Sequence, residues 1–255
     1  MSFSSVLPAP ALRHAIARYW ALRAEFARPE RIVLLPDAGI HMLVVRGAGV
    51  RSRRFDTTLE AGRLHLVGAM LRSDEQILLG EQALVGVTFR PGGFPCFYEW
   101  AAMREVADRV VPFERALALD AWRPLAELAP QLDRHFLERL RPPTSNVLQV
   151  VADIEACAGD VRVDALTKRH GTTGRTLERH FVREVGITPK ELAAITRLRR
   201  ALTVIERDRG RRSLMEIAWD CGYYDHAHLT RELERFLGER PSRVALSDLS
   251  KMAAG

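Results

Sequence analysis

The sequence predicts an α+β protein in which an N-terminal β-rich, barrel-like domain with flanking helices precedes a C-terminal all-α domain. Between residues 32 and 90, short apolar or alternating runs are separated by Gly, Pro and Asp, which is the pattern of antiparallel strands. After residue 146, apolar residues recur at helical spacing, and one helical segment occurs twice. A chain of 255 residues, 47% of them hydrophobic, is long enough to form two such cores.

The N-terminal half is expected to run from a helix through strands to a second helix. The first helical pattern is "ALRHAIARYWAL" at 11–22. The strand candidates are "RIVLLPD" (31–37), "IHMLVVRG" (40–47), "RLHLVGAM" (63–70) and "ALVGVTFRPGG" (83–93). The second helix is expected within 123–140, where four apolar residues share one face despite Pro130: Leu125, Leu128, Leu132 and Phe136.

The segment "RLRPPTSN" at 139–146 is the predicted domain boundary. Its two prolines stop the preceding helix, and Thr144, Ser145 or Asn146 can cap the next one. We therefore expect an N-terminal domain at 1–142, a C-terminal domain at 146–246 and a short tail at 247–255.

The C-terminal half contains an internal repeat. "LTKRHGTTGRTLERHFVREVGITP" (166–189) aligns with "IAWDCGYYDHAHLTRELERFLGERP" (217–241). From the second helix of each copy onward the spacing is constant, and the matched pairs are Leu177 with Leu229, Phe181 with Leu233, Gly186 with Gly238, and Pro189 with Pro241. Chance is a poor explanation for so many matches at fixed spacing.

Each copy has the pattern of a helix-turn-helix unit. Gly171 or Gly222 permits the left-handed conformation that ends the first helix. Thr173 and Asp225 are suitable N-caps for the second helix, whose paired apolar residues face inward. Between the copies, "ELAAITRLRRALTVIERD" predicts one long linker helix with these residues buried: Leu192, Ile195, Leu198, Leu202 and Ile205.

With these motifs in order, the chain resembles the AraC/XylS family of bacterial transcription regulators over roughly 146–246. The resemblance rests on "LTKRHGTTGRTLERHF", "GITP", "RLRRA", "EIAWDCGYYDHAHLTREL" and "GERP". Leu229 and Leu233 replace the usual phenylalanines, and Thr167 replaces the usual alanine. The N-terminal half more weakly resembles the sensor-like domains of such regulators, through "LLPDAGIHMLVV" and "GVTFRPGGF". The resemblance implies a sequence-specific, ligand-responsive regulator, and an activator is expected.

The second helix of each unit is expected in the DNA major groove with its first turns against base edges. The outward face of the first recognition helix presents Arg175, Glu178 and Arg179; that of the second presents His226, Ala227, His228 and Arg231. Arginine can pair with guanine and glutamate can accept from the cytosine amino group, and the family motif points to the same positions. In the alternative interpretation these residues form a solvated face, with Glu178 merely paired to a neighbouring arginine. The arginines of "ERDRGRR" (206–212) either meet phosphates or lie in a solvated loop.

Cys221, Asp225, His226 and His228 also raise the question of a zinc site. Cys221 precedes the turn glycine, where a buried apolar residue fits, and the two histidines are two positions apart and point in different directions. We therefore predict no metal and no cofactor. Three dispersed cysteines without a CxxC pair indicate a reduced, cytoplasmic protein, and no membrane span or secretory signal is expected.

The N-terminal half offers fewer signals. His41 and His65 on strands are expected to be structural, and Arg90 in "FRPGGF" either binds an effector anion or caps the sheet. We expect a sensing or dimerisation domain there, with dimer contacts through the helix around Leu125 to Leu140. The alternative function is a DNA-repair or DNA-modification enzyme with catalysis in this half, although no known catalytic motif is present and Cys96 lacks a reactive setting.

The charge of +6 is compatible with nucleic acid but is weak evidence alone. The expected partner is double-stranded DNA; a small-molecule effector, RNA polymerase and a second copy of the chain are further candidates.

Overall fold

The computed structural model describes residues 1–114, 117, 119–208 and 210–238. The predicted tail at 247–255, and Pro241 of the repeat, lie outside the described residues. The strands are β1 (Ser2–Val6), β2 (Ile16–Leu34), β3 (Ile40–Gly47), β4 (Val50–Ser52), β5 (Thr57–Leu59), β6 (Leu64–Val67), β7 (Asp74–Phe89) and β8 (Val110–Pro112). The α-helices are α1 (Leu125–Leu137), α2 (Val147–Ala156), α3 (Val163–Arg169), α4 (Gly174–Glu184), α5 (Pro189–Asp208), α6 (Leu214–Asp220) and α7 (His226–Leu237). None of the described helices is both long and apolar enough to cross a bilayer.

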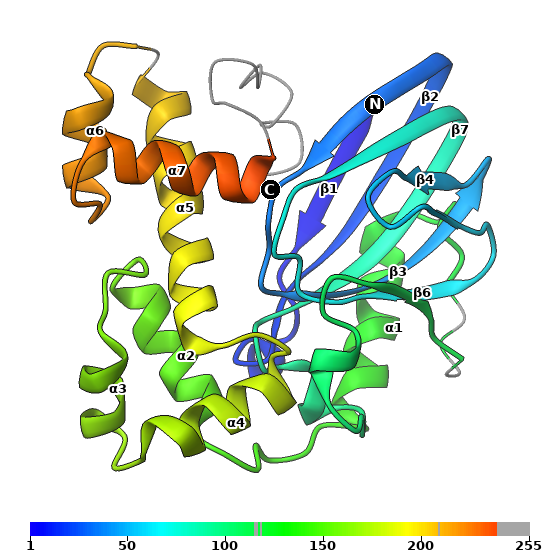
Figure 1. Cartoon of the computed structure of the whole chain (residues 1–255). Helices are drawn as coiled ribbons and strands as arrows, with labels where there is room; N and C mark the ends of the chain where they lie inside the picture. The colour runs from blue at the N-terminus through cyan, green and yellow to red at the C-terminus, as the bar shows by residue number, and fades with distance from the viewer. Residues whose placement is uncertain (115–116, 118, 209, 239–255) are drawn as a thin grey trace.

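The N-terminal domain is an antiparallel sheet in the order β1-β2-β7-β3-β6-β8, with β4 and β5 attached to one part of β7 (Figure 1). Long strands β2 and β7 pair along most of their length, with a register shift between Phe26 and Glu30. Strand β4 pairs with β7 and β5 pairs with β4, so the sheet curves around an interior. The α+β class and the barrel-like N-terminal domain are thus confirmed.

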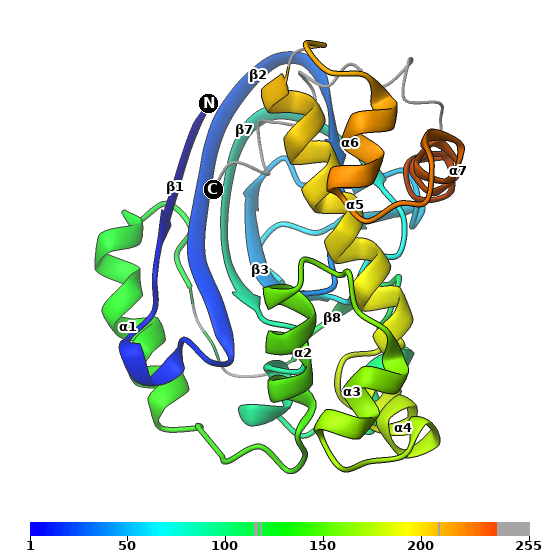
Figure 2. The same cartoon turned by 90° about the vertical axis from the view of Figure 1, so that its left-hand side faces the viewer.

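The sheet buries both of its faces. One face, which includes Tyr19 and Val85, packs on α1 and on the segment around Phe94. The other face, which includes Trp20 and Leu84, lines the curved interior. In Figure 2, α1 stands beside β1 and β2, and the C-terminal helices lie on the other side of the strands.

The helix predicted at 11–22 is wrong. Residues 10–12 form a single 3-10 turn, residues 13–15 form a turn, and β2 begins at Ile16. Because both sheet faces are covered, consecutive residues from Tyr19 to Leu22 are all buried. The strand therefore lacks the alternation of apolar and polar residues by which a half-exposed strand is recognised.

Helix α1 confirms the second helical prediction of this half. It tolerates Pro130 within its length, and its four predicted apolar residues are buried in the core of its own domain. A dimer contact through α1 would therefore have to use its outer face, which is mostly polar apart from Leu137.

The C-terminal helices form two helix-turn-helix units, α3–α4 and α6–α7, joined by α5. The predicted caps are confirmed: the side chain of Thr173 accepts from the Thr176 amide, and that of Asp225 accepts from the His228 amide. Gly171 and Gly222 have φ values of +57° and +75°, as the predicted turns require. The predicted linker-helix residues are buried, except Ile205, which is half-buried against the same core.

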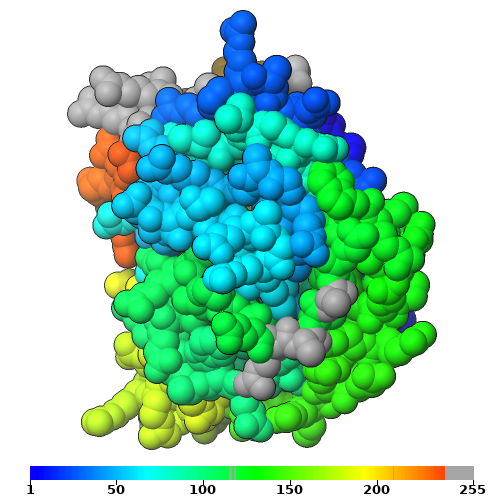
Figure 3. All heavy atoms as spheres, turned by 90° about the vertical axis from the view of Figure 1, so that its right-hand side faces the viewer, coloured from blue at the N-terminus to red at the C-terminus, as the bar shows by residue number. Residues whose placement is uncertain are grey.

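The two domains contact each other at both helix-turn-helix units. Gly186, just after α4, packs against the backbone of Met103. After α7, the amide of Ser73 donates to the Phe236 carbonyl at 2.8 Å, and the Ser73 hydroxyl donates to the Leu237 carbonyl at 2.9 Å. The face of the molecule on the side away from the helix-turn-helix units is formed chiefly by the N-terminal domain (Figure 3).

Candidate nucleic-acid interface and sensor pocket

The recognition helices α4 and α7 are arranged alike relative to the N-terminal domain. In Figure 1 both run from the side away from the sheet toward the sheet, so their first turns point away from it. Their apolar residues, Leu177 and Phe181 in α4 and Leu229 and Leu233 in α7, are fully buried in one shared core. This burial fixes which face of each helix is turned outward.

The outward face of α4 carries the predicted polar residues. Arg175, Glu178 and Arg179 are exposed. Among the described residues, none of these three makes an ion pair or hydrogen bond through its side chain. The alternative in which Glu178 is merely paired to a neighbouring arginine therefore finds no support in the geometry, and all three side chains are available to a ligand.

In α7, His226 and Arg231 are exposed, whereas Ala227 and His228 are half-buried. The His228 ring lies edge-on to Tyr223, with centroids 5.3 Å apart, and its Nδ1 accepts from the Tyr224 amide at 3.4 Å. This bond places the ring hydrogen on Nε2, which can still donate outward. His228 therefore has a structural role at the turn in addition to any contact with DNA.

The structure does not gather the candidate zinc ligands. Cys221 is fully buried in the core of the second unit, where burial raises the pKa of its thiol. His226 is exposed, and Asp225 caps α7. Within the described part of the chain, no three His, Cys, Asp or Glu side chains are grouped as a metal would require.

The arginines between the units divide into two kinds. Arg212 pairs with Asp208 at 2.9 Å and also with Asp220, so its charge is already neutralised within the protein. Arg211 is exposed on the same loop. Arg212 is thus less available to phosphate than Arg211, and Arg209 of this segment lies outside the described residues.

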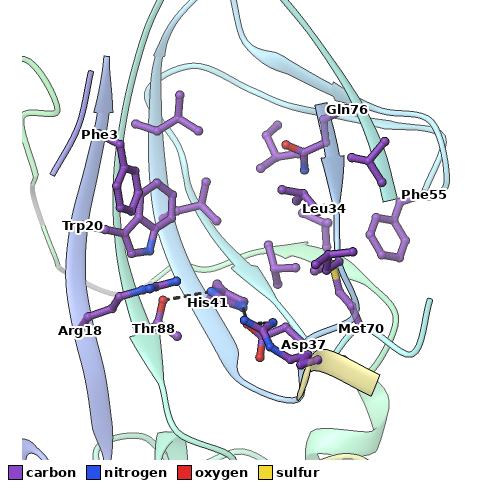
Figure 4. Close-up of a pocket in the computed structure, with 18 residues that line it drawn as sticks. Phe3, Arg18, Trp20, Leu34, Asp37, His41, Phe55, Met70, Gln76 and Thr88 are labelled. Atoms are coloured by element: carbon purple, nitrogen blue, oxygen red, sulfur yellow. Dashed lines mark hydrogen bonds and ion pairs between the residues drawn. The ribbon is translucent and has the colours of Figure 1, made fainter. Parts of the chain in front are cut away.

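A pocket of about 110 Å³ opens inside the curved sheet of the N-terminal domain (Figure 4). Its walls are mainly apolar. Phe3 and Trp20 line one side, and Leu34, Phe55 and Met70 line the other. One end is polar and is formed by Arg18, Asp37, His41, Thr88 and Arg199.

The polar end contains one paired and one unpaired arginine. Arg199, from α5 of the other domain, donates to the Pro36 carbonyl at 3.2 Å and lies 3.4 Å from the Asp37 carboxylate. Arg18, from β2, makes no ion pair or hydrogen bond among the described residues, and its Nε is buried. Burial lowers the pKa of Arg18, while the charge of Asp37 partly opposes this shift.

Asp37 is the charge that connects the two domains at this pocket. Its burial alone would raise the pKa of the carboxyl group. The charge of Arg199, together with the nearby His41 ring and the hydrogen bond from the Gly39 amide, outweighs burial and holds this pKa below its usual range. Asp37 is therefore an anion at neutral pH, and the polar end carries two arginine charges against one carboxylate.

His41 lines this polar end and contacts other groups of the protein there. Its Nδ1 lies 3.2 Å from the Thr88 hydroxyl, and its Nε2 lies 3.4 Å from Asp37 without a well-formed hydrogen bond. His65, by contrast, is buried and bonded to the Glu60 carbonyl at 3.1 Å, as expected of a structural histidine.

A second, wider cleft of about 500 Å³ lies between the domains. It shares Arg18, Asp37, Thr88 and Arg199 with the inner pocket, and α5 forms one wall. Arg90 also lines it, where it donates to the Arg13 carbonyl at 2.9 Å and pairs with Glu155 of α2 at 3.1 Å. Arg90 therefore fastens the sheet to the turn before β2 and bridges the domains.

No pattern in the sequence indicates that Arg18, Asp37 and Arg199 meet. Arg18 lies in the segment interpreted as a helix, and Arg199 belongs to the other domain. Cys96 is buried among aromatic rings, and burial raises the pKa of its thiol to about 11, so it lacks the activation expected of a nucleophile.

Comparison with known proteins supports this architecture. A helix-turn-helix domain family matches residues 166–246, and a family described as a domain of unknown function (DUF6597) matches residues 4–112. None of the curated proteins matches the chain.

Among solved structures, ToxT from Vibrio cholerae superposes with a TM-score of 0.51 at 9% identity, covering 98% of this chain and 100% of ToxT. A ligand-free lysine-to-alanine variant of ToxT from strain SCE256 gives a TM-score of 0.50 at 11% identity, covering 91% and 98% of the two chains. At such low identity the likeness shows a shared fold. Together with the family match, it shows a helix-turn-helix domain over residues 166–246, attached to a β-rich N-terminal domain.

Proposed function

We propose that this protein is a cytoplasmic, ligand-responsive transcription regulator that reads DNA with α4 and α7. The observation that carries the proposal is the repeated unit: two recognition helices with equivalent buried faces and equivalent outward turns, joined by one continuous helix. Helices that read successive major grooves on one side of DNA are spaced by roughly 34 Å, or one helical turn. A stiff α5 would keep that spacing, so a single chain would read a bipartite, non-palindromic site.

The base contacts are assigned to the outward side chains described above. Arg175 and Arg179 would pair with guanine, and Glu178 would accept from a cytosine amino group. On the second helix, Arg231 would reach a base, while His226 and the Nε2 of His228 would donate to bases or phosphates. Ala227 would contact a thymine methyl group.

Ligand response is supported by the inner pocket. It is apolar with a small set of convergent polar groups, as small-molecule sites are. Its polar end includes Arg199, which belongs to the helix that joins the two DNA-reading units. A ligand that alters the Arg199–Asp37 contact would change how α5 sits on the sheet, and by linkage DNA would change the affinity for that ligand.

Two further partners remain proposals. A second copy of the chain would raise affinity for paired sites by avidity, and RNA polymerase would be the target of an activator. The alternative function, an enzyme acting on DNA from the N-terminal half, has no supporting observation.

The test is selection of bound fragments from genomic DNA by the full chain. We expect the recovered fragments to share two conserved blocks about one helical turn apart, and binding to weaken steeply with salt because phosphate contacts release counterions. Fragments that share no motif, with affinity equal to that for bulk DNA, would overturn the proposal. The variant Arg51→Ala, on β4 of the N-terminal domain, is a matched control because it removes an arginine charge that belongs to neither recognition helix.

A further inference from the structure

The inner pocket contains an arginine that the protein itself leaves without a partner. Arg18 lies on β2 with its Nε buried and unbonded, while Arg199 beside it is already held by Asp37 and the Pro36 carbonyl. Arg18 is half-buried and feels the charge of Asp37 without a direct ion pair to it, so a ligand carboxylate would supply a direct counter-charge together with hydrogen bonds.

Apolar side chains surround the rest of the cavity. Figure 4 shows Trp20 on one side and Phe55 on the other, with the charged groups at one end and the amide of Gln76 at the other. The volume of about 110 Å³ is of the order of a cavity of roughly 150 Å³ that holds benzene. The pocket therefore suits a ligand body of about one ring or a short branched chain, with its polar group at one end.

We propose that the effector is a compact monocarboxylate, with one aromatic ring or a short apolar chain, whose carboxylate pairs with Arg18. This inference rests on the proposed ligand response and specifies its chemistry. The bidentate fork of Arg18 would meet the two carboxylate oxygens, and the Thr88 hydroxyl and the His41 ring line the same end of the pocket. The Asp37 carboxylate excludes a second anionic group from this end of the pocket, so dianions should bind worse than monoanions.

The probe is benzoate, and the neutral comparison is benzyl alcohol, which has the same ring without the charge. Binding to the full chain is measured by thermal unfolding and by quenching of tryptophan fluorescence, because Trp20 lines the pocket. We expect benzoate to stabilise the protein, benzyl alcohol to do so far less, and Arg18→Gln to weaken benzoate binding about tenfold to a hundredfold. Arg46→Gln is the matched control, since Arg46 lies on β3 of the same sheet but does not line the pocket.

The outcomes separate the class of ligand from the function of the protein. Equal stabilisation by benzyl alcohol and benzoate, unchanged benzoate binding by Arg18→Gln, or no effect of benzoate would overturn the proposal. Stronger binding of phthalate than of benzoate would overturn the exclusion of dianions by Asp37. DNA binding by the same preparations is measured in parallel. If the wild-type chain binds specific DNA but fails the ligand test, only the monocarboxylate proposal is wrong. If the wild-type chain shows no specific DNA binding, the proposed function is wrong.

Discussion

Replacing Gly186 with alanine should disrupt the contact between the first helix-turn-helix unit and the N-terminal domain. Gly186 has a φ of +92°, and an added Cβ would lie 2.7 Å from the Met103 carbonyl oxygen and 3.0 Å from its carbon. The left-handed conformation alone costs about 1–2 kcal/mol for an L-residue. Overpacking against a backbone carbonyl that cannot rotate away adds about 1–3 kcal/mol.

Gly171→Ala is the matched control, because Gly171 has a φ of +57° in the same unit but nothing lies within 4 Å of its added Cβ. It should therefore cost only the conformational part, about 1–2 kcal/mol. The assay is urea unfolding followed by far-ultraviolet circular dichroism, in the full chain and in a 146–255 fragment. The excess cost of Gly186→Ala should appear in the full chain and largely disappear in the fragment. An equal cost for both glycines in the full chain, or the same excess in the fragment, would refute the reasoning.

Three further predictions concern single groups. In the native protein a thiol reagent should modify the exposed Cys157 rapidly and the buried Cys96 and Cys221 slowly. All three cysteines should react in denaturant. Rapid modification of Cys96 in the native protein would support the alternative function as an enzyme. Asp37 should stabilise the fold above about pH 4, the usual range of a carboxyl group, and this contribution should be lost as pH falls through the lower pKa of the folded state. Asp37→Asn should therefore lower the free energy of unfolding at neutral pH, and by less in acid. A loss of stability that does not change with pH would contradict the charged pair. A chelator should leave the melting temperature of the 146–255 fragment unchanged, and a drop would restore the zinc site at Cys221 and His228.

Local signals in the sequence were sufficient to predict the C-terminal domain. Turn glycines, capping side chains and paired apolar residues each act over a few residues of the sequence. Each of these signals occurs once in each helix-turn-helix unit. Thr173 and Asp225 cap their helices as expected. The half-buried position of His228 was not predictable, because it depends on the ring of Tyr223 across the turn.

The N-terminal domain was harder to predict because its contacts are long-range. Strand β2 is buried on both faces, so the segment around Tyr19 resembled a helix. The pocket's polar end joins Arg18, Asp37 and Arg199, which are far apart in the sequence and meet only when α5 packs on the sheet. Short-range patterns carry no information about such a meeting.

The central claim is that two equivalent helices read two separate parts of one DNA site. It is tested most directly by determining the base preference of Arg179→Ala and Arg231→Ala by selection from randomised DNA. Arg235→Ala is the control on α7, because Arg235 is paired with Glu232 at 3.2 Å.

Each of the two variants should lose about 1–3 kcal/mol of specific binding and relax preference at one position, with the two positions about one helical turn apart. The control should keep the wild-type base preference. Unchanged preference in both variants, or relaxation at the same position, would contradict the account.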